Sequence, residues 1–404
     1  MIWQRVVAVV NARVVTPDGI ADAVRFTSRI LSAGDAPRPG DVVIDARGGF
    51  VLPGLINAHD HLELNHYGRL KFRERYDNAT EWSADMRPRL ECDERIRAGR
   101  GRPLTDRVLV GAAKNVLSGV TTVAHHNPFY PELRRQLPIR VLRRYGWAHS
   151  FALQDRPSGA RGESGGDIQD RFRSTPSAVP FFLHVGEGTD AAARTELSRL
   201  HQLGCLASNT VLVHAVAAGD DDWRRVRQAG ATIVWCPASN LFLLGTTLNV
   251  GELRRTRGMI PVALGTDSRL TGSRDLLDEL QCARQSSSVS NEDLLAMVTT
   301  AAADIIGQSQ LGRLCPGAPA DLILVPGVRD QPADALLSSS RRDLELVVVG
   351  GRPMVANPAF ASMFDARRTA PLPIRLDGTL KLADSALARR MISCSIAEPG
   401  LLAA

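Results

Sequence analysis

The stretch "VLPGLINAHDH" (residues 51–61) joins a nearly continuous apolar run to two histidines that are separated by one aspartate. Such a run is typical of a strand buried on both faces of a parallel sheet. Side chains two positions apart on a strand point to the same face, so we expect His59 and His61 to lie side by side. The stretch therefore predicts a buried strand that ends in a pair of imidazoles.

Six further apolar runs follow along the chain. They are "GVTTVAHHN" (119–127), "YGWAHSFAL" (145–153), "VPFFLHVGEG" (179–188), "NTVLVHAV" (209–216), "GATIVWCP" (230–237) and "MIPVALGTD" (259–267). Amphipathic stretches lie between or beside them, and residues 106–119 and 290–307 each predict a helix that ends at a glycine. This alternation is typical of repeated βα units in a barrel or in a doubly wound sheet.

Three regions depart from the alternation. Short β-branched runs and tight turns fill residues 6–45, and strands of the same kind return after residue 313, so two β-rich ends flank the middle. Gln154 to Ala178 is polar and rich in Gly, Ser and Arg, and we expect a surface loop there with a shortened or missing barrel unit. Its GxSxG match at residues 162–166 lacks the preceding apolar strand that a nucleophile elbow needs, and we interpret it as chance.

The composition is that of a soluble globular protein. The 404 residues are 44% hydrophobic and 23% charged, and the net charge of +6 comes from scattered arginines without a basic run. Six cysteines show no CxxC spacing, so we expect reduced thiols rather than a disulfide framework or a structural zinc site. The first residues resemble neither a secretory signal nor a membrane span, which predicts a cytoplasmic protein with no membrane or nucleic-acid partner.

Groups that can bind a divalent metal lie at the ends of four apolar runs. The first run gives His59 and His61, and the others give His184, His214 and Asp267. In a parallel barrel the carboxyl ends of all strands lie on one face, so these side chains would converge on one pocket. His125, His126 and His149 also end runs and can equally line the pocket or pack in the core, whereas His201 on a helix is interpreted as structural.

Seven motifs in this order resemble the amidohydrolase superfamily, in particular the branch of cytosine, guanine and adenosine-type deaminases and triazine hydrolases. They are "LPGLINAHDHLE", "GVTTVAHHNP", "LHVGEGTD", "LVHAV", "CPASNLFL", "ALGTDS" and "GRLCPGAPADLILV". The resemblance spans Val6 to Val355 and implies a (β/α)8 TIM-like barrel, with one shortened unit, plus a small composite β-sandwich from both chain ends. The expected domains are residues 1–50 with 313–365 for the sandwich, 51–312 for the barrel, and 366–404 for a C-terminal extension.

The resemblance also implies roles for single residues. His59, His61, His184 and Asp267 match the ligands of one divalent metal ion, for which Zn²⁺ is expected and Fe²⁺ or Mn²⁺ are alternatives. His214 matches a histidine that contacts water or substrate, and Glu187 matches the HxxE acid/base. None of the three lysines (Lys71, Lys114, Lys381) lies at a strand end, where a carboxylated lysine would bridge two metals. One metal is therefore expected.

These residues predict a metal-dependent hydrolase of non-peptide C–N bonds. A metal-activated water would replace the amino group of a small heterocycle, with Asp267 accepting the water proton and Glu187 supplying a proton to the leaving group. Hydrolysis of a cyclic amide or of another leaving group, and a non-catalytic scaffold, remain alternatives. A cytidine-type zinc deaminase is disfavoured, because His61-Leu62-Glu63 has no PCxxC partner.

The loops at the strand ends would select a small-molecule substrate. Six candidate substrate-binding residues are His66, Tyr67, Asn127, Trp147, Ser239 and Asn240. We also expect a homo-oligomer, specifically a dimer.

Overall fold

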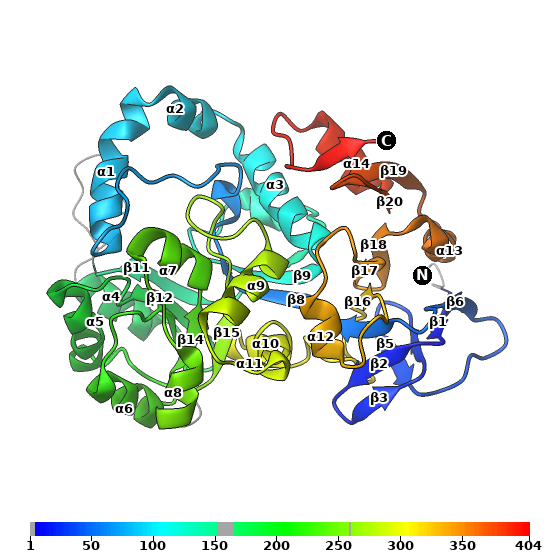
Figure 1. The fold of residues 1–404 in the computed structure, drawn as a ribbon, viewed down its shortest axis with the longest axis horizontal. Coiled ribbons are helices and arrows are strands. Elements are labelled where there is room, and N and C mark those ends of the chain that lie inside the picture. Colours follow the sequence, from blue (N-terminus) through cyan, green and yellow to red (C-terminus); the bar gives the residue numbers. More distant parts are fainter. Residues whose placement is uncertain (1–4, 152–164, 258–259) are drawn as a thin grey trace.

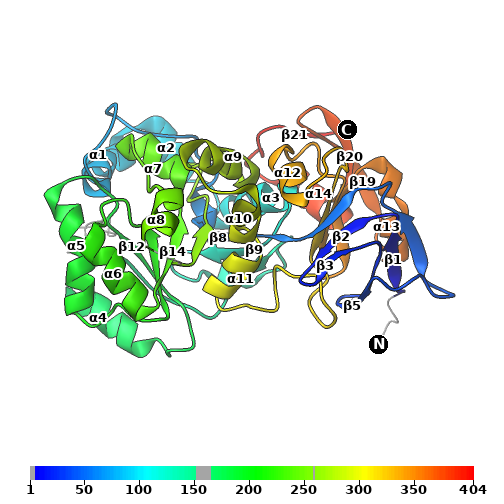
Figure 2. The ribbon, with the colours of Figure 1, turned by 60° about the horizontal axis from the view of Figure 1, so that its bottom comes forward.

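The computed structural model describes residues 5–151, 165–257 and 260–404. A body of alternating strands and helices lies at one end of the long axis, and a group of mostly antiparallel sheets that includes both chain ends lies at the other (Figures 1 and 2). No described helix is long and apolar enough to span a membrane.

Within the described residues, eight parallel strands form the first body, in the hydrogen-bonded groups β10-β9-β8 and β11-β12-β13-β14-β15. Their bounds are β8 (Leu55–Asp60), β9 (Val120–His125), β10 (Arg140–Val141), β11 (Gly146–Ser150), β12 (Phe181–Val185), β13 (Thr210–His214), β14 (Thr232–Trp235) and β15 (Val262–Leu264). The ring closes where the Asp267 N–H donates to the His59 carbonyl at 3.1 Å. Gly265 permits this approach, because a Cβ there would lie 2.6 Å from the His59 Cβ. The TIM-like barrel is therefore confirmed.

Helices cover the outside of the barrel and its strand ends (Figure 2). They are α1 (Ala79–Cys92), α2 (Glu94–Arg100), α3 (Leu104–Leu117), α4 (Gly165–Ser174), α5 (Ala191–Gln202), α6 (Asp220–Ala229), α7 (Pro237–Leu244), α8 (Val250–Arg257), α9 (Leu276–Ser286), α10 (Asn291–Met297) and α11 (Thr300–Ile305), with the 3-10 turns η1 (Leu62–Leu64) and η2 (Pro131–Arg134). The first predicted helix is α3, and Gly119 ends it with φ of +82°. The single helix predicted over 290–307 was wrong: the Val298 carbonyl accepts from Ile56 N–H of β8, and the chain divides there into α10 and α11.

The shortened barrel unit is not where the sequence placed it. Helix α4 occupies residues 165–174 and buries Ile168, so this part of the predicted loop contains a helix that follows β11. Phe172, four residues later, meets Phe181 of β12 edge-on. The two-residue strand β10 is the short one, because only four residues separate it from β11 and leave no room for a helix. Residues 152–164, with most of the GxSxG match, lie outside the described part of the chain.

Two sheets form the second body. One has the order β5-β4-β1-β6 and the other the order β21-β19-β20-β18-β17-β16-β7-β2-β3. Their bounds are β1 (Val7–Val10), β2 (Arg13–Thr16), β3 (Gly19–Ala21), β4 (Val24–Phe26), β5 (Ile30–Ala33), β6 (Val42–Asp45), β7 (Phe50–Pro53), β16 (Leu322–Val325), β17 (Leu346–Val349), β18 (Arg352–Ala356), β19 (Pro371–Leu376), β20 (Thr379–Asp384) and β21 (Leu401–Ala403). The helices α12 (Pro332–Leu337), α13 (Ser362–Ala366) and α14 (Ser385–Ser393) and the turn η3 (Pro358–Phe360) accompany them.

The two chain ends share one sheet and one core. Strand β7 pairs antiparallel with β16, so an N-terminal strand is joined by hydrogen bonds to a strand from the distant C-terminal part of the chain. Val9 and Phe26 of the smaller sheet are buried in the same apolar cluster as Leu322 and Val348 of the larger one. Neither sheet could bury this cluster alone.

Candidate active site

Three histidines meet at the carboxyl ends of β8 and β12. The Nε2 atoms of His59 and His184 lie 3.2 Å apart, and the His59 and His61 rings lie 4.9 Å apart at their centroids. One donor atom from each of the three residues lies within 4.8 Å of the others, and all three side chains are buried. The predicted pair on β8 and the histidine of β12 are therefore brought together.

Asp267 follows β15 and faces the same cluster. Its Oδ1 atom lies 3.4 Å from His61 Nε2 and 3.9 Å from His59 Nε2. The hydroxyls of Ser239 and Thr271 donate to its Oδ2 at 2.8 and 2.7 Å, and Ser268 N–H donates to Oδ1 at 2.7 Å. Asp267 has φ of +51°, a left-handed conformation that a non-glycine residue adopts only when its surroundings enforce it. These contacts fix the direction of the carboxylate.

The charge states of the cluster suit metal binding. Burial lowers the pKa values of His59 and His184 well below the usual range, which keeps both imidazoles neutral at pH 7. Burial opposes ionisation of Asp267, but the nearby imidazoles of His61 and His214, together with the two hydroxyl donors, hold the pKa of this carboxyl below its usual value. The His184 Nδ1–H can donate to the His149 carbonyl at 2.9 Å and leave the Nε2 lone pair directed at the cluster.

His214 and Glu187 form the opposite side of the site. His214 Nε2 lies 3.6 Å from Glu187 Oε1, and His214 Nδ1 lies 2.7 Å from the Asn240 side-chain oxygen. His214 and the next residue, Ala215, both have positive φ, at the point where β13 ends. Burial, reinforced by the Asp267 charge, raises the pKa of Glu187 well above its usual range. A buried carboxyl of this kind can hold a proton near neutral pH and deliver it.

These groups surround a cavity of about 200 Å³. Its wall is formed by His61, Leu64, Ala79, Trp82, Ser83, Asn127, His149, His184, Glu187, His214, Leu243, Asp267, Ser268, Leu270 and Thr271. Asn127 follows β9 and donates to Glu63 Oε1 at 2.5 Å. The cavity is therefore narrow, partly polar and lined by all of the predicted catalytic residues.

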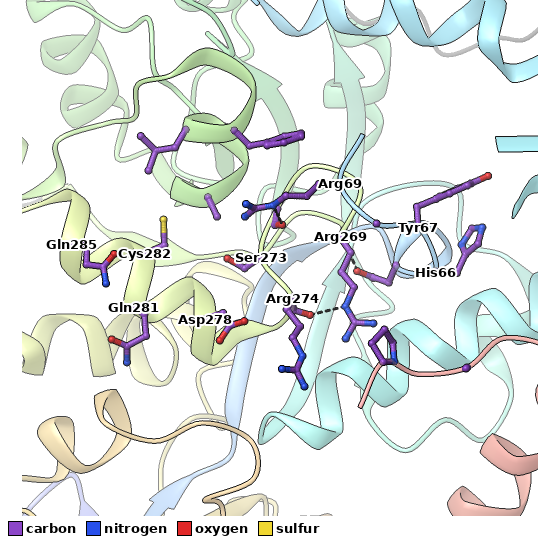
Figure 3. A pocket seen from close by; sticks show the side chains of 18 residues that line it. His66, Tyr67, Arg69, Arg269, Ser273, Arg274, Asp278, Gln281, Cys282 and Gln285 are labelled. Carbon is purple, nitrogen blue, oxygen red and sulfur yellow. Dashed lines mark hydrogen bonds between the residues drawn. The ribbon is translucent and has the colours of Figure 1, made fainter. Parts of the chain in front are cut away.

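The candidate substrate-binding residues occupy different places. Asn127 lines the cavity. Ser239 and Asn240 are wholly buried and do not line it; Ser239 hydrogen-bonds to Asp267, and Asn240 hydrogen-bonds to His214. Trp147 packs edge-on against His126. His66 and Tyr67 line a separate outer cavity of about 810 Å³, and His66 Nε2 contacts the Gly99 carbonyl at 3.1 Å (Figure 3).

Sequence reasoning gave no decided role to several residues at the site. His126 stacks on His184 with a ring separation of 4.2 Å, and its Nε2 contacts the Ala148 carbonyl. Thr271 and Trp82 were not singled out at all, because they come from a loop and a helix without a recognisable motif. For His126 and His149, the position at the end of an apolar run did indicate that they could line the pocket.

A buried polar network lies behind β8. Lys114 of α3 has no exposed side-chain surface, and its Nζ donates to Asp60 Oδ2 at 3.2 Å and to Thr266 Oγ1 at 2.9 Å. Asn57 and Asn115 donate to the same Asp60 oxygen at 3.2 and 2.8 Å. Lys114 thus contacts Asp60, the residue between His59 and His61, on the opposite face of β8 from the two imidazoles. Lys114 lies on a helix, as the sequence predicts.

Comparison with known proteins agrees with this geometry. Residues 185–354 match the model of the amidohydrolase family. The chain carries an amidohydrolase family domain. It is 26% identical over 369 residues to a 5-methylthioadenosine/S-adenosylhomocysteine deaminase of Halobacterium salinarum, covering 79% of this chain and 82% of the relative. It is 24% identical over 414 residues to an 8-oxoguanine deaminase of Pseudomonas aeruginosa, covering 82% and 88%. The recognised family and the enzyme class, a hydrolase of C–N bonds, are confirmed.

Solved structures share the fold of this chain. An atrazine chlorohydrolase of Arthrobacter aurescens, complexed with zinc, superposes with a TM-score of 0.69 at 20% identity, covering 89% of this chain and 99% of the other. An adenosine deaminase of Xanthomonas campestris with bound zinc gives the same TM-score at 16% identity, covering 90% and 97%. At these identities the likeness concerns the fold.

Proposed function

We propose that this amidohydrolase removes the amino group of a small aminated heterocycle by hydrolysis. The observation that carries the proposal is the convergence of His59, His61, His184 and Asp267 on one small cavity, with Glu187 and His214 on its other side. The relatives named as deaminases support this reaction over the hydrolysis of a cyclic amide.

The donor set fits one divalent metal ion. The Nε2 atoms of the neutral His59 and His184 lie 3.2 Å apart, where one ring can donate to the other only as its Nε2–H tautomer, whereas a cation would accept the Nε2 lone pairs of both rings. The Asp267 oxygen adds a hard anionic ligand. His59, His61, His184 and Asp267 would hold the ion, which we propose to be Zn²⁺, with Fe²⁺ and Mn²⁺ acceptable to the same donors. When bound, such an ion makes a water molecule acidic enough to act as a nucleophile near pH 7.

The side chains of the cavity divide the proton transfers between them. Asp267 Oδ1, the oxygen on the side of the histidines, accepts the proton of the attacking water, while Ser239 and Thr271 keep Oδ2 occupied. Glu187 carries a proton to the ring nitrogen or to the departing amine. His214, whose Nδ1–H donates to the Asn240 side-chain oxygen, directs its Nε2 lone pair toward Glu187 and would orient the attacking water by accepting a hydrogen bond from it.

Asn127 and the apolar wall would bind the substrate. The cavity of about 200 Å³ accommodates one heterocyclic ring rather than a polymer, in keeping with a small-molecule substrate. Trp82, Leu243 and Leu270 offer apolar faces for a planar ring, and Asn127 offers a polar edge. We retain His66, Tyr67 and Trp147 as predicted determinants of a larger substrate, to be tested by substitution.

The domain division and the assembly are also proposals. We propose that residues 1–50 and 313–365 build a composite β-sandwich, 51–312 the barrel and 366–404 an extension, supported by the buried apolar cluster that Val9 and Phe26 share with Leu322 and Val348. A fragment that comprises residues 55–312 should then be insoluble or strongly destabilised, and a stable, active fragment would contradict the division. We further propose a homodimer, which sedimentation equilibrium would test.

An ammonia-release screen tests the proposed reaction. The purified protein, supplied with one equivalent of Zn²⁺, is incubated with aminated purines, pyrimidines, triazines and their nucleosides, and free ammonia is measured. We expect ammonia from at least one ring class and none from the His184→Ala variant. Release of another leaving group, such as chloride or an alkylamine, without ammonia would favour the alternative hydrolase, and no release of any kind would favour the non-catalytic scaffold.

A further inference from the structure

A glutamate near the C-terminus is buried in ion pairs with two arginines. The side chain of Glu398 has no exposed surface. Its two oxygens accept from the two terminal nitrogens of Arg269 at 2.7 and 2.8 Å, and Oε1 also accepts from Arg341 at 2.6 Å. The Arg269 contact is the parallel, two-bond pairing that fixes both position and orientation.

Arg269 belongs to the loop that follows Asp267. Within this loop, Gly272 N–H donates to the Ser268 carbonyl at 2.7 Å, which makes a tight turn. Ser268, Leu270 and Thr271 line the catalytic cavity, and Thr271 also donates to Asp267 Oδ2. Residues 268–271 thus position the catalytic aspartate from one side and face the cavity from the other.

Arg269 also forms hydrogen bonds within the loop that follows Asp267 and to the segment that follows β8. Its Nε donates to the Arg274 carbonyl at 2.7 Å, and this bond crosses the wall of the outer cavity (Figure 3). The Arg269 N–H donates to Asn65 Oδ1 at 3.1 Å, and Asn65 in turn donates to Asp60 at 2.8 Å. One residue therefore links the turn after β15, the network behind β8 and Glu398.

The C-terminal segment presents Glu398 from a rigid frame. Arg341 donates from Nε to Asp377 Oδ2 at 2.8 Å and also contacts the Pro399 carbonyl. Asp377 N–H donates to the Gly400 carbonyl at 2.8 Å. Gly400 has φ of +79°, and a Cβ there would lie 2.1 Å from Asp377 Oδ1, so the backbone must be glycine to pass this close. The segment that carries Glu398 is thereby fixed against the sheet.

We propose that Glu398 is a positioning residue for the proposed hydrolytic reaction: by holding Arg269 it fixes the loop that orients Asp267 and closes one side of the cavity. This assignment of a catalytic contribution rests on the proposed function. The C-terminal extension, residues 366–404, then contributes to the geometry of the active site as well as adding strands to the sheet. Removing the charge of Glu398 leaves Arg269 buried without its partner, and the loop would have to move to rehydrate it.

The test compares Glu398→Gln with a matched buried pair that is far from the site. Asp41 pairs with Arg25 at 2.7 Å with side-chain exposures of 5% and 6%, close to the 0% and 6% of Glu398 and Arg269. Asp41→Asn is therefore the control. We expect Glu398→Gln to retain one equivalent of metal while kcat falls between about 10-fold and 100-fold, as misplacement of a catalytic group costs. Asp41→Asn should lower the melting temperature and leave kcat within about twofold.

Hydrogen exchange gives a readout that needs no activity. Amides of residues 268–273 should exchange at least about 10-fold faster in Glu398→Gln, whereas in Asp41→Asn faster exchange should stay in the sheet of β1 and β4. If Glu398→Gln does not fold, Arg269→Lys serves, because it keeps the charge but loses the paired hydrogen bonds, and the same two changes are expected.

The outcomes separate the two proposals. Unchanged exchange in 268–273 together with kcat within twofold of the unmodified protein would overturn the role of Glu398, even if stability fell. Faster exchange in a protein that hydrolyses nothing in the screen would contradict the proposed function and leave the positioning of the loop standing. A loss of kcat equal to that of Asp41→Asn would mean that Glu398 serves stability alone.

Discussion

His214 Nε2 lies 3.6 Å from Glu187 Oε1, beside the three imidazoles of the candidate metal site. The two residues stand at the ends of neighbouring strands, β12 and β13, and burial drives both toward their neutral forms. Glu187 therefore keeps its proton near neutral pH, and the neutral His214 does not compete for the charge of an ion pair. The proton of Glu187 is then available to the substrate. In the proposed reaction this pair, and not the candidate metal ligands alone, supplies the acid–base chemistry of the cavity.

Replacing Glu187 by Gln should remove the proton carrier and keep the shape of the side chain. We expect kcat to fall on the order of 10²-fold or more, the usual size of a general acid–base contribution, while the metal content stays at one equivalent. Steady-state kinetics and elemental analysis of the same sample measure both. Near-normal turnover, or loss of metal together with activity, would assign Glu187 a different role.

Replacing His184 by Ala should remove most of the bound metal, because in the proposed site this residue is the ligand from β12. His201→Ala, on the exposed side of α5, is the control and should retain the metal. Elemental analysis after dialysis against a weak chelator makes the comparison. Equal metal content in the two variants would show that the ion is bound elsewhere.

Replacing Lys114 by Met should break the buried pair with Asp60 and leave that carboxylate without its charged partner. We expect a loss of stability of about 3–5 kcal/mol and metal binding that is weaker by about 10-fold to 100-fold, since the strand end that carries His59 and His61 loses its support. Lys381→Met is the matched control: Lys381 is equally buried, but donates to the Leu344 carbonyl and to Asn357, far from the site. Weaker metal binding in the control variant as well would argue against a local effect.

Glu279 should make stability depend on pH. Burial raises its pKa from 4.5 to about 7, so between these values the folded chain holds a proton that the unfolded chain has lost. Stability is therefore full below about pH 4.5 and falls as the pH rises through about 7, by about 3 kcal/mol. Glu279→Gln keeps an oxygen for the Ala238 N–H and has no proton to lose.

The melting temperature of Glu279→Gln should accordingly fall less between pH 5 and pH 8 than that of the unmodified protein. Glu94→Gln, an exposed position at the start of α2, is the control and should keep the original slope. Thermal unfolding followed by circular dichroism at several pH values measures the slopes. Identical slopes in all three proteins would contradict the assignment to Glu279.

The repeated βα units and the residues at their strand ends could be predicted because both follow from local patterns, whereas the choice of a barrel over a doubly wound sheet came from the family resemblance. The alternation on β8 places His59 beside His61, and the parallel order of the strands brings His184 and Asp267 to the same face whatever the loops do. The acid/base role of Glu187 was implied by the family resemblance, through the HxxE spacing to His184, and the burial of Glu187 agrees with that role.

The rest depended on contacts between distant parts of the chain. Residues 165–174 form α4 because Ile168 and Phe172 give them an apolar face, a signal that the surrounding Gly, Ser and Arg residues obscured. The short unit lies instead at β10, where only four residues precede β11. Ser239 and Asn240 contact Asp267 and His214 rather than the open cavity, which depends on how α7 is oriented. Nothing in the sequence near Glu398 indicates that its partner is Arg269, 129 residues earlier.

Titration of the metal-free protein with Zn²⁺, with the rate of ammonia release from the best substrate as readout, tests the central claim most directly. That claim is that one ion, bound by His59, His61, His184 and Asp267, is needed for the displacement of ammonia by water. The rate should rise in proportion to added metal and reach its plateau at about one equivalent per chain. Full activity without metal, or a plateau only at two equivalents, would contradict it.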